Sequence, residues 1–392
     1  MPETPNRWLM MSLGLVAQAC ASSYLYGLPM LLPRLRADSH LSLSAAGWLV
    51  AAPSIGLLMT LIAWGAFVDR RGERGAMVTG LVLSGCLLFG AAVVDDFAAR
   101  FALLALAGGA GGSVNSAGGR IVLGWFAAHE RGTAMGARQT AQPLGVALAA
   151  ITFPAIADAA GTGWAIALPG ALCVLVALAV ARYVVDPPRP VAAHGDPAPT
   201  SPYRTPTLWR LHAASAALVV PQFAISAFAL DFLVEQRHWS AAGAGRLLFC
   251  FQLLGAAGRV LTGIWSDRVG GRLRPMRNIA VAAGLTMLAA GLGAAHHSLL
   301  AVVAIGAGVV ITVADNGLGF TASAELAGSA WAGRAMGVQN TGQGITVSLT
   351  PPLLGALIAS AGFGWGFGVA AFFPLIAVFT IPVAAEAAVT HR

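Results

Sequence analysis

Residues 65–74, GAFVDRRGER, decide how this chain is interpreted. They end a long apolar run with a Gly, three residues, an Asp and an Arg, and a further Gly and Arg follow. The same pattern returns in the second half of the chain, where positions 263–272 read GIWSDRVGGR. One charged turn after an apolar run is ordinary, but the same turn at corresponding places in two halves predicts an internal repeat.

The composition is that of a membrane protein. Charged residues make up 10% of the chain, against about 25% in an average soluble domain, and hydrophobic residues make up 57%. Apolar stretches long enough to cross a bilayer as helices follow one another along nearly the whole sequence. The first of them exceeds a signal-peptide core and has no clear cleavage pattern, so we expect a retained span.

Twelve membrane-spanning helices are predicted. We expect them at residues 8–33, 44–68, 76–95, 98–126, 133–157, 163–184, 208–234, 241–266, 278–295, 299–325, 333–360 and 364–385. The only long polar stretch, which is rich in proline, separates the sixth span from the seventh and is a linker. The predicted fold is an all-α membrane protein with an N-terminal six-helix bundle (1–185), a cytoplasmic linker (186–207) and a C-terminal six-helix bundle (208–392).

The repeat extends beyond the two charged turns. A shift of 201 residues aligns segment 134–142 with segment 335–343, including Ala-Met-Gly, a Thr and the final Gln. The same shift places Asn115 of the fourth span on Asn316 of the tenth. We therefore expect the two bundles to be pseudo-symmetric, an arrangement typical of transporters.

The arginines predict how the chain is oriented. All 23 basic residues are arginine, and with a cytoplasmic N-terminus fifteen of them face the cytoplasm and four the other side. We expect both termini and the linker in the cytoplasm. The net charge of +7 is thus a topology signal, and no nucleic-acid partner is expected. The four cysteines lie in apolar runs without metal-like spacing and are interpreted as buried small hydrophobic residues.

On these features the sequence resembles the major facilitator superfamily over essentially its whole length. The family's signature loop, between the second and third spans, matches G-x3-D-R-x-G-x-R at 65–74, with a fainter copy at 263–272. The resemblance implies a monomeric secondary active transporter in the plasma membrane of a bacterium, working by rocker-switch alternating access. The substrate stays open, because this family moves sugars, drugs, peptides, anions and nucleosides on one scaffold.

The resemblance also implies that each signature loop docks on the opposite half when the cytoplasmic side is closed. We expect Asp69 to meet the start of the eleventh span near 333–335, and Asp267 to meet the start of the fifth near 132–134. A helix start carries unpaired N–H groups and about half a positive charge, so a carboxylate there contributes roughly 0.3–2 kcal/mol, a suitable strength for a reversible latch. The candidate latch residues are Gly65, Asp69, Arg70, Arg74, Asp267 and Arg268.

Two ionisable residues lie at membrane depth, where such residues mark functional sites by default. Asp315 is the deepest acid, near the middle of the tenth span, and Arg259 lies in the eighth. Family members resembling nitrate, oxalate and monocarboxylate carriers place a substrate-facing arginine in the pattern G-R-x3-G-x2-S-D-R, which 258–268 match. Nitrate carriers have a second arginine in the second span, where this chain has Leu61, so a two-arginine clamp is not expected.

Two interpretations of Arg259 and Asp315 stay open. In the first, Arg259 binds an anionic substrate and Asp315 couples transport to protons. Burial disfavours a charged carboxylate and a neighbouring arginine favours it, so a substrate that draws Arg259 away makes Asp315 easier to protonate. In the second, the two charges only neutralise each other inside the C-terminal bundle.

Other polar side chains lie on spans that line the cavity in this family. The expected substrate contacts, beside Arg259 and Asn316, are Gln139, Gln142, Asn340, Gln343, Tyr26, Gln18, Gln222 and Arg138. Their alternative role is to hold helices together, and Arg120 and Arg138 have the further alternative of reaching the membrane interface or pairing with the signature loops. Asp231, near the outer end of the seventh span, is a second candidate for proton coupling, with a solvated rim as the alternative.

Three function classes are compared. A carrier of a small anion, coupled to protons or to a counter-substrate, fits Arg259, Asp315 and the amides. The alternative is drug or metabolite efflux by proton antiport, but 141–147 read AQPLGVA and lack the exporter pattern G-x3-G-P-x2-G-G. A sensor or scaffold would need an added soluble domain. Because the chain has no lysine for an ATP-binding loop, no catalytic set and no zinc-like cluster, we expect no enzyme, cofactor or metal.

Overall fold

The structure is a computed structural model that describes residues 6–31, 34–35, 43–187, 201–239 and 241–386. All regular secondary structure within these residues is helical, and twelve helical segments are long and apolar enough to cross a membrane. The predicted all-α fold with twelve spans is therefore confirmed. The termini at 1–5 and 387–392, and most of the predicted linker (188–200), lie outside the described residues.

The chain forms two compact units. Unit 1 comprises Met1–Ala127, Thr140–Pro199 and Gly328–Thr341, and unit 2 comprises Ala128–Gln139, Thr200–Ala327 and Gly342–Arg392. Each unit thus combines most of one half of the sequence with a short segment from the other half. Those two short segments are the starts of the fifth and eleventh spans, which the sequence predicted to meet the signature loops.

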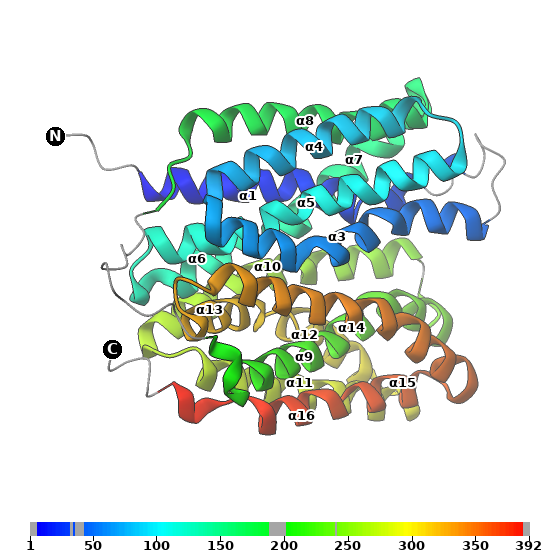
Figure 1. The fold of residues 1–392 in the computed structure, drawn as a ribbon. Helices are drawn as coiled ribbons and strands as arrows, with labels where there is room; N and C mark the ends of the chain where they lie inside the picture. The colour runs from blue at the N-terminus through cyan, green and yellow to red at the C-terminus, as the bar shows by residue number, and fades with distance from the viewer. Residues whose placement is uncertain (1–5, 32–33, 36–42, 188–200, 240, 387–392) are drawn as a thin grey trace. The chain divides into compact units, whose positions relative to one another are not determined.

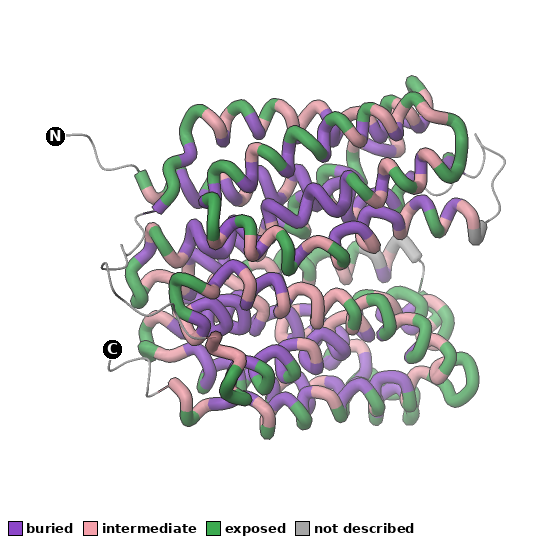
Figure 2. The backbone as a smooth tube through the Cα atoms, viewed as in Figure 1, coloured by how far each residue is buried: buried purple, intermediate pink, exposed green. Residues whose placement is uncertain are grey.

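Unit 1 is built around a glycine-rich helix. Its helices are α1 (Arg7–Leu25), η1 (Leu28–Leu31), α3 (Leu43–Arg71), α4 (Glu73–Val93), α5 (Phe97–Trp125), α7 (Ala141–Ala160) and α8 (Thr162–Tyr183), together with the start of α14 (Ala332–Ala361). α5 packs against α3 and α4, and α1 packs against α7 (Figure 1). A Cβ on Gly108 of α5 would lie 1.9 Å from the carbonyl oxygen of Pro53, so only glycine lets these backbones approach so closely. Most of α5 is consequently buried (Figure 2).

Unit 2 contains the remaining helices. They are η2 (Ala128–Glu130), α6 (Arg131–Arg138), η3 (Pro202–Arg204), α9 (Pro206–Asp231), η4 (Phe232–Gln236), α10 (Ala241–Val269), α11 (Leu273–Ala295), α12 (Leu299–Ile311), α13 (Asn316–Ala327), α15 (Phe363–Ala370), α16 (Phe372–Thr380) and η5 (Val383–Ala385), with the rest of α14. α11 packs against α12, α15 and α16, and α6 packs against α10 and α13. Phe232 and Phe367 meet edge to face in the apolar core.

Two predicted spans are interrupted. In the tenth span α12 ends at Ile311, residues 312–315 form turns, and α13 begins at Asn316. In the fifth span α6 ends at Arg138 and α7 begins at Ala141. Irregular backbone at membrane depth frees polar groups that lipid cannot satisfy, so it occurs where protein or a polar cavity surrounds it. Both breaks therefore lie at positions suited to function.

Candidate functional site

The first latch joins Asp69 to the start of α14 within unit 1. The Asp69 carboxylate accepts the backbone N–H of Gly333 at 3.1 Å and that of Arg334 at 3.2 Å. It also receives the Arg120 guanidinium at 2.8 Å, and Arg120 in turn contacts Glu73 at 2.7 Å. These are the backbone contacts predicted for Asp69, and of the roles weighed for Arg120 the structure shows pairing with the signature loop.

The second latch joins Asp267 to the start of α6 within unit 2. Its carboxylate accepts the backbone N–H of Gly132 at 2.8 Å and of Thr133 at 2.7 Å, and the Thr133 hydroxyl at 2.7 Å. Arg272 neutralises it at 2.6 Å. The contact predicted from pseudo-symmetry is present here as well, while the role of both contacts as latches stays a prediction.

A glycine contact accompanies each carboxylate. A Cβ on Gly65 would lie 2.5 Å from the carbonyl oxygen of Gly333, and a Cβ on Gly333 would lie 2.7 Å from that of Gly65. The corresponding distances for Gly132 and Gly263 at the second latch are 2.6 and 2.2 Å. The glycine of the signature loop is therefore required because two helix backbones touch there.

The contact continues for one more turn of each helix. A Cβ on Gly337 would lie 2.8 Å from the carbonyl oxygen of Leu61 in unit 1, and a Cβ on Gly136 would lie 2.4 Å from that of Arg259 in unit 2. At each latch, two glycines spaced four residues apart on one helix pack against the backbone of the helix that carries the aspartate. In unit 2 this glycine contact ends directly at the backbone of Arg259.

The other arginines predicted for the latches lie elsewhere. Arg70 and Arg268 are exposed and form no hydrogen bond or ion pair with any residue in the described part of the chain. The backbone N–H of Arg74 donates to the Asp186 carboxylate at 2.7 Å. In unit 2 the backbone N–H of Leu273 donates to Glu386 at 2.6 Å. The acid after the last span of each half therefore caps the helix that follows the signature loop, a pairing that no sequence pattern indicates.

Arg259 and Asp315 lie together in unit 2 without direct pairing. Arg259 is half-buried, donates from Nη1 to the carbonyl oxygen of Gln139 at 3.4 Å, and has no hydrogen-bond partner at Nε. Asp315 is 2% exposed and is the last residue before α13 begins. The two charges interact electrostatically, but among the described residues no direct ion pair joins them. The two side chains therefore lie close enough to interact, but neither neutralises the other through a direct ion pair.

An amide pair recurs in both units. In unit 2 Asn316 donates from Nδ2 to Oε1 of Gln222 at 3.2 Å, and in unit 1 Gln18 donates from Nε2 to Oδ1 of Asn115 at 3.2 Å. Each pair ties the first helix of a half to its fourth. The buried Oε1 of Gln18 has no hydrogen-bond partner. These amides thus hold helices together, which is the alternative role predicted for them. The helices that carry them are those expected to face the substrate.

The interrupted fifth span carries two more predicted residues. Arg138 is 4% exposed, and its Nη1 donates to Oε1 of Gln139 at 3.2 Å. The backbone carbonyl of Gln139, in the turn after α6, is the group that accepts from Arg259. Arg138, Gln139, Arg259 and Asp315 consequently belong to one neighbourhood of unit 2.

The remaining predicted residues are spread more widely. Tyr26 and Gln343 are half-buried, Gln142 is exposed, and Asn340 donates to the carbonyl oxygen of Met336 in its own helix at 2.9 Å. Asp231 is exposed at the end of α9. Among the described residues, none of them forms a hydrogen bond or an ion pair with Arg259 or Asp315, so their roles stay predictions.

Comparison with known proteins identifies the fold and the family. A family model described as "Major Facilitator Superfamily" matches residues 13–350. A Mycobacterium tuberculosis protein described as the uncharacterized MFS-type transporter Rv2994 is 42% identical over 382 residues, covering 96% of this chain and 85% of the relative. A probable hexose phosphate transport protein of Chlamydia pneumoniae is 25% identical over 259 residues, 56% of each chain. The crystal structure of the E. coli fucose:proton symporter FucP has the same fold, with a TM-score of 0.75 at 14% identity over 95% of this chain and 98% of that one.

Proposed function

This chain belongs to the Major Facilitator Superfamily of membrane transporters, and we propose that it carries a small organic anion by proton-coupled or exchange transport. The single observation that carries the proposal is the half-buried Arg259, whose Nε lacks a partner, beside a buried acid at a break in the tenth span. A buried guanidinium without full hydrogen bonding is costly, and a carboxylate or phosphate ligand would complete it in bidentate geometry.

The position of Asp315 supports a role in coupling. Its carboxylate is fully inside unit 2, and a charge so placed is tolerated only with compensation from a partner or from a proton. When an anion binds Arg259, the attraction between Arg259 and Asp315 weakens and proton uptake by Asp315 offsets the lost compensation. Anion binding and proton binding would thereby favour each other.

The amides would orient the substrate. Asn316 follows Asp315 directly and is held by Gln222, so its carboxamide is fixed at the start of α13. A helix start presents unpaired N–H groups, which favour an anion at the same place. We assign Asn316 and Gln222 to polar contacts with the bound anion, and Gln139 and Arg138 to the wall of the same site.

The latches would link binding to alternating access. Gly136 packs on the backbone of Arg259, and four residues earlier Gly132 packs on Gly263. A shift of the Arg259 backbone on substrate binding is therefore transmitted directly to the second latch. Release of both latches would open the cytoplasmic side, as the rocker-switch cycle requires.

The Chlamydia relative supports an anionic substrate. It is described as a probable hexose phosphate transport protein, and a hexose phosphate is a small organic anion. Its 25% identity covers 56% of this chain, so it supports the chemical class and no particular compound.

A binding screen tests the proposal. Purified protein is heated with monocarboxylates, dicarboxylates and hexose phosphates at two pH values, and melting temperatures are compared. We expect one anion class to stabilise the protein more strongly at the lower pH. Arg259→Ala should weaken that binding about tenfold or more, the loss expected for a charge-assisted contact.

The matched control is Arg246→Ala, an exposed arginine on the same helix α10. It removes the same charge away from the site and should leave binding unchanged. Equal anion binding by wild type and Arg259→Ala would contradict the proposal. So would stabilisation of the protein by neutral sugars alone.

A further inference from the structure

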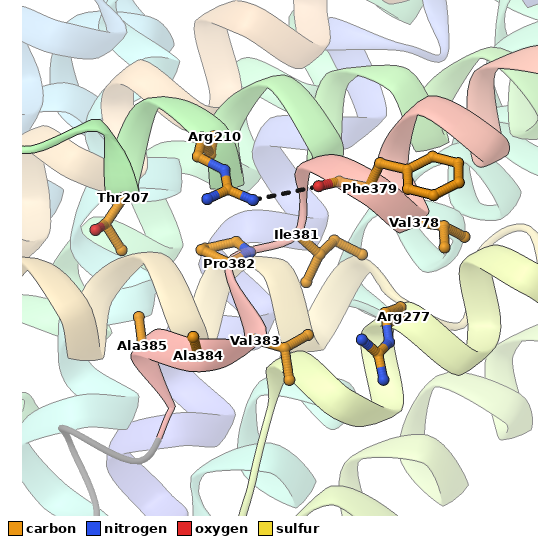
Figure 3. Close-up of a pocket in the computed structure, with 10 residues that line it drawn as sticks. All are labelled: Thr207, Arg210, Arg277, Val378, Phe379, Ile381, Pro382, Val383, Ala384 and Ala385. Atoms are coloured by element: carbon orange, nitrogen blue, oxygen red, sulfur yellow. Dashed lines mark hydrogen bonds between the residues drawn. The ribbon is translucent and has the colours of Figure 1, made fainter.

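A charged cavity lies in unit 2, apart from Arg259 and Asp315. It has a volume of about 420 Å³ and is formed where α9 and α11 begin and α16 ends (Figure 3). Arg210 and Thr207 enter it from α9, Arg277 from α11, and Phe379 from α16. The size is within the range of about 300–1,000 Å³ that is usual for small-molecule sites.

The cavity carries two positive charges. Arg210 donates from Nη2 to the carbonyl oxygen of Phe379 at 3.2 Å (Figure 3). It also donates from Nε to the carbonyl oxygen of Thr380 at 3.2 Å. These carbonyls end α16 and lack partners within the helix, so they fix the guanidinium in place. Arg277 is exposed and is held by no hydrogen bond from the described residues.

No acid of the described chain compensates these charges. The nearest acid along the chain, Glu386, accepts the backbone N–H of Leu273 at 2.6 Å and lies 3.8 Å from Nε of Arg274. Neither Arg210 nor Arg277 forms an ion pair with an acid in the described part of the chain. The cavity therefore offers one fixed and one unengaged guanidinium to an anion.

The two arginines lie as far from their helix starts as a headgroup layer is thick. Each is the fifth residue of its helix, about 6 Å from the helix start at 1.5 Å per residue. The polar layer on each side of a bilayer is roughly 5–8 Å thick. Phe379, which is 79% exposed, lines the cavity as aromatic side chains do at membrane interfaces.

We propose that this cavity binds the phosphate headgroup of an anionic phospholipid. Arg210 and Arg277 would hold the phosphate, the Thr207 hydroxyl would donate to an ester or glycerol oxygen, and the acyl chains would run along Phe379. Basic pockets between membrane helices on the cytoplasmic side are suited to such headgroups. The proposal does not depend on the transported substrate, because none of these residues belongs to the neighbourhood of Arg259.

Lipid titration of the purified, delipidated protein tests this. Phosphatidylglycerol is added to the full chain in detergent, and binding is followed by native mass spectrometry together with the melting temperature. Phosphatidylcholine with the same acyl chains serves as the zwitterionic reference. We expect phosphatidylglycerol to bind and stabilise the wild type, and Arg277→Gln to weaken its binding about fivefold, the effect of one arginine at a membrane surface.

Arg274→Gln is the matched control. Arg274 is on the same helix three residues earlier, is 76% exposed, and does not line the cavity. It should bind phosphatidylglycerol as the wild type does. If Arg277→Gln proves unstable, Arg277→Lys keeps the charge without the planar fork and should bind more weakly than wild type.

Three outcomes would overturn the proposal. The first is equal stabilisation by phosphatidylglycerol and phosphatidylcholine. The second is equal loss in Arg277→Gln and Arg274→Gln, which would indicate a diffuse surface charge. The third is the same stabilisation of wild type by inorganic phosphate alone at millimolar concentration, which would indicate a site for free anions.

Discussion

The two latches make the same contacts, but the helices that carry the latch aspartates, α3 and α10, have different side chains one turn before the signature glycine. Four residues before the glycine of each signature loop, α3 carries Leu61 and α10 carries Arg259. The backbone of each contacts a glycine of the docked segment, Gly337 or Gly136. In unit 1 the side chain is 2% exposed and apolar, and in unit 2 it is a half-buried cation.

The tenth span differs from the fourth in the same way. The shift that aligns Asn115 with Asn316 places Val114 on Asp315, and Val114 is fully buried in an uninterrupted α5. The paired amides, the glycines and the latch aspartates occur in both units, whereas the pair Arg259–Asp315 and the break in the tenth span have no counterpart in the described part of unit 1. We propose that the shared features serve the movement common to both units, and that Arg259 and Asp315 serve the substrate.

The largest expected effect concerns the shared framework. Gly263→Ala and Gly65→Ala place a methyl group within 2.2 and 2.5 Å of a carbonyl oxygen, and such overpacking costs about 1–3 kcal/mol. We expect each to disfavour the closed latch by up to about 100-fold and to reduce transport accordingly. Gly75→Ala, where a Cβ meets nothing, is the control. If either variant transports at the rate of the Gly75→Ala control, the two latches are not equivalent.

The next prediction exchanges residues between the units. Arg259→Leu gives unit 2 the residue of unit 1 and should weaken anion binding by about 10- to 100-fold. It should also lower the melting temperature, because the buried Asp315 carboxylate loses its compensating charge. The double variant Arg259→Leu with Asp315→Val removes both charges. Because we assign both to function, it should remain inactive although well folded. Restored transport in the double variant would show that the charges only neutralise each other.

A smaller effect is expected from the latch aspartates. Asp69→Asn and Asp267→Asn each remove a charge from a helix start, worth roughly 0.3–2 kcal/mol, so the resting population should shift about 2- to 30-fold toward the form open to the cytoplasm. The measurement is labelling of an engineered cysteine on the latch surface by an impermeant maleimide added to inside-out vesicles. The latch account is wrong if labelling does not rise in either variant.

The smallest effect separates the two amide pairs. Gln18→Ala and Gln222→Ala each remove one neutral hydrogen bond, worth about 1 kcal/mol. Both should lower the melting temperature slightly, and Gln222→Ala alone should also weaken anion binding, by about fivefold. Equal effects on binding would place substrate contacts in both units.

Most of the fold was predictable from the sequence. The apolar runs predicted the spans because length and hydrophobicity suffice for helices in a bilayer. The recurring G-x3-D-R turns and the shift of 201 predicted which segments meet, so the contacts of Asp69 and Asp267 followed from symmetry. The apolar runs and the charged turns are local in the sequence, and the turns occur twice, so both can be recognised from the sequence alone.

The site was only partly predictable. Arg259 and Asp315 were expected from their depth, but no local signal marks the breaks at 312–315 and 139–140, because polar residues within an apolar run are also compatible with a continuous helix. The Arg120 contact with Glu73 joins residues 47 positions apart, and such distant partners leave no periodic pattern. The partners of a charge are set by tertiary packing.

The most direct test of a charged pair specific to unit 2 is pH-driven accumulation in proteoliposomes, measured for wild type and Asp315→Asn with the anion that the binding screen identifies. Wild type should accumulate the anion when the interior is made alkaline, and Asp158→Asn, an exposed residue of unit 1, should do the same. Asp315→Asn should still bind the anion but lose pH-driven accumulation. Accumulation by Asp315→Asn at the wild-type level would contradict the account.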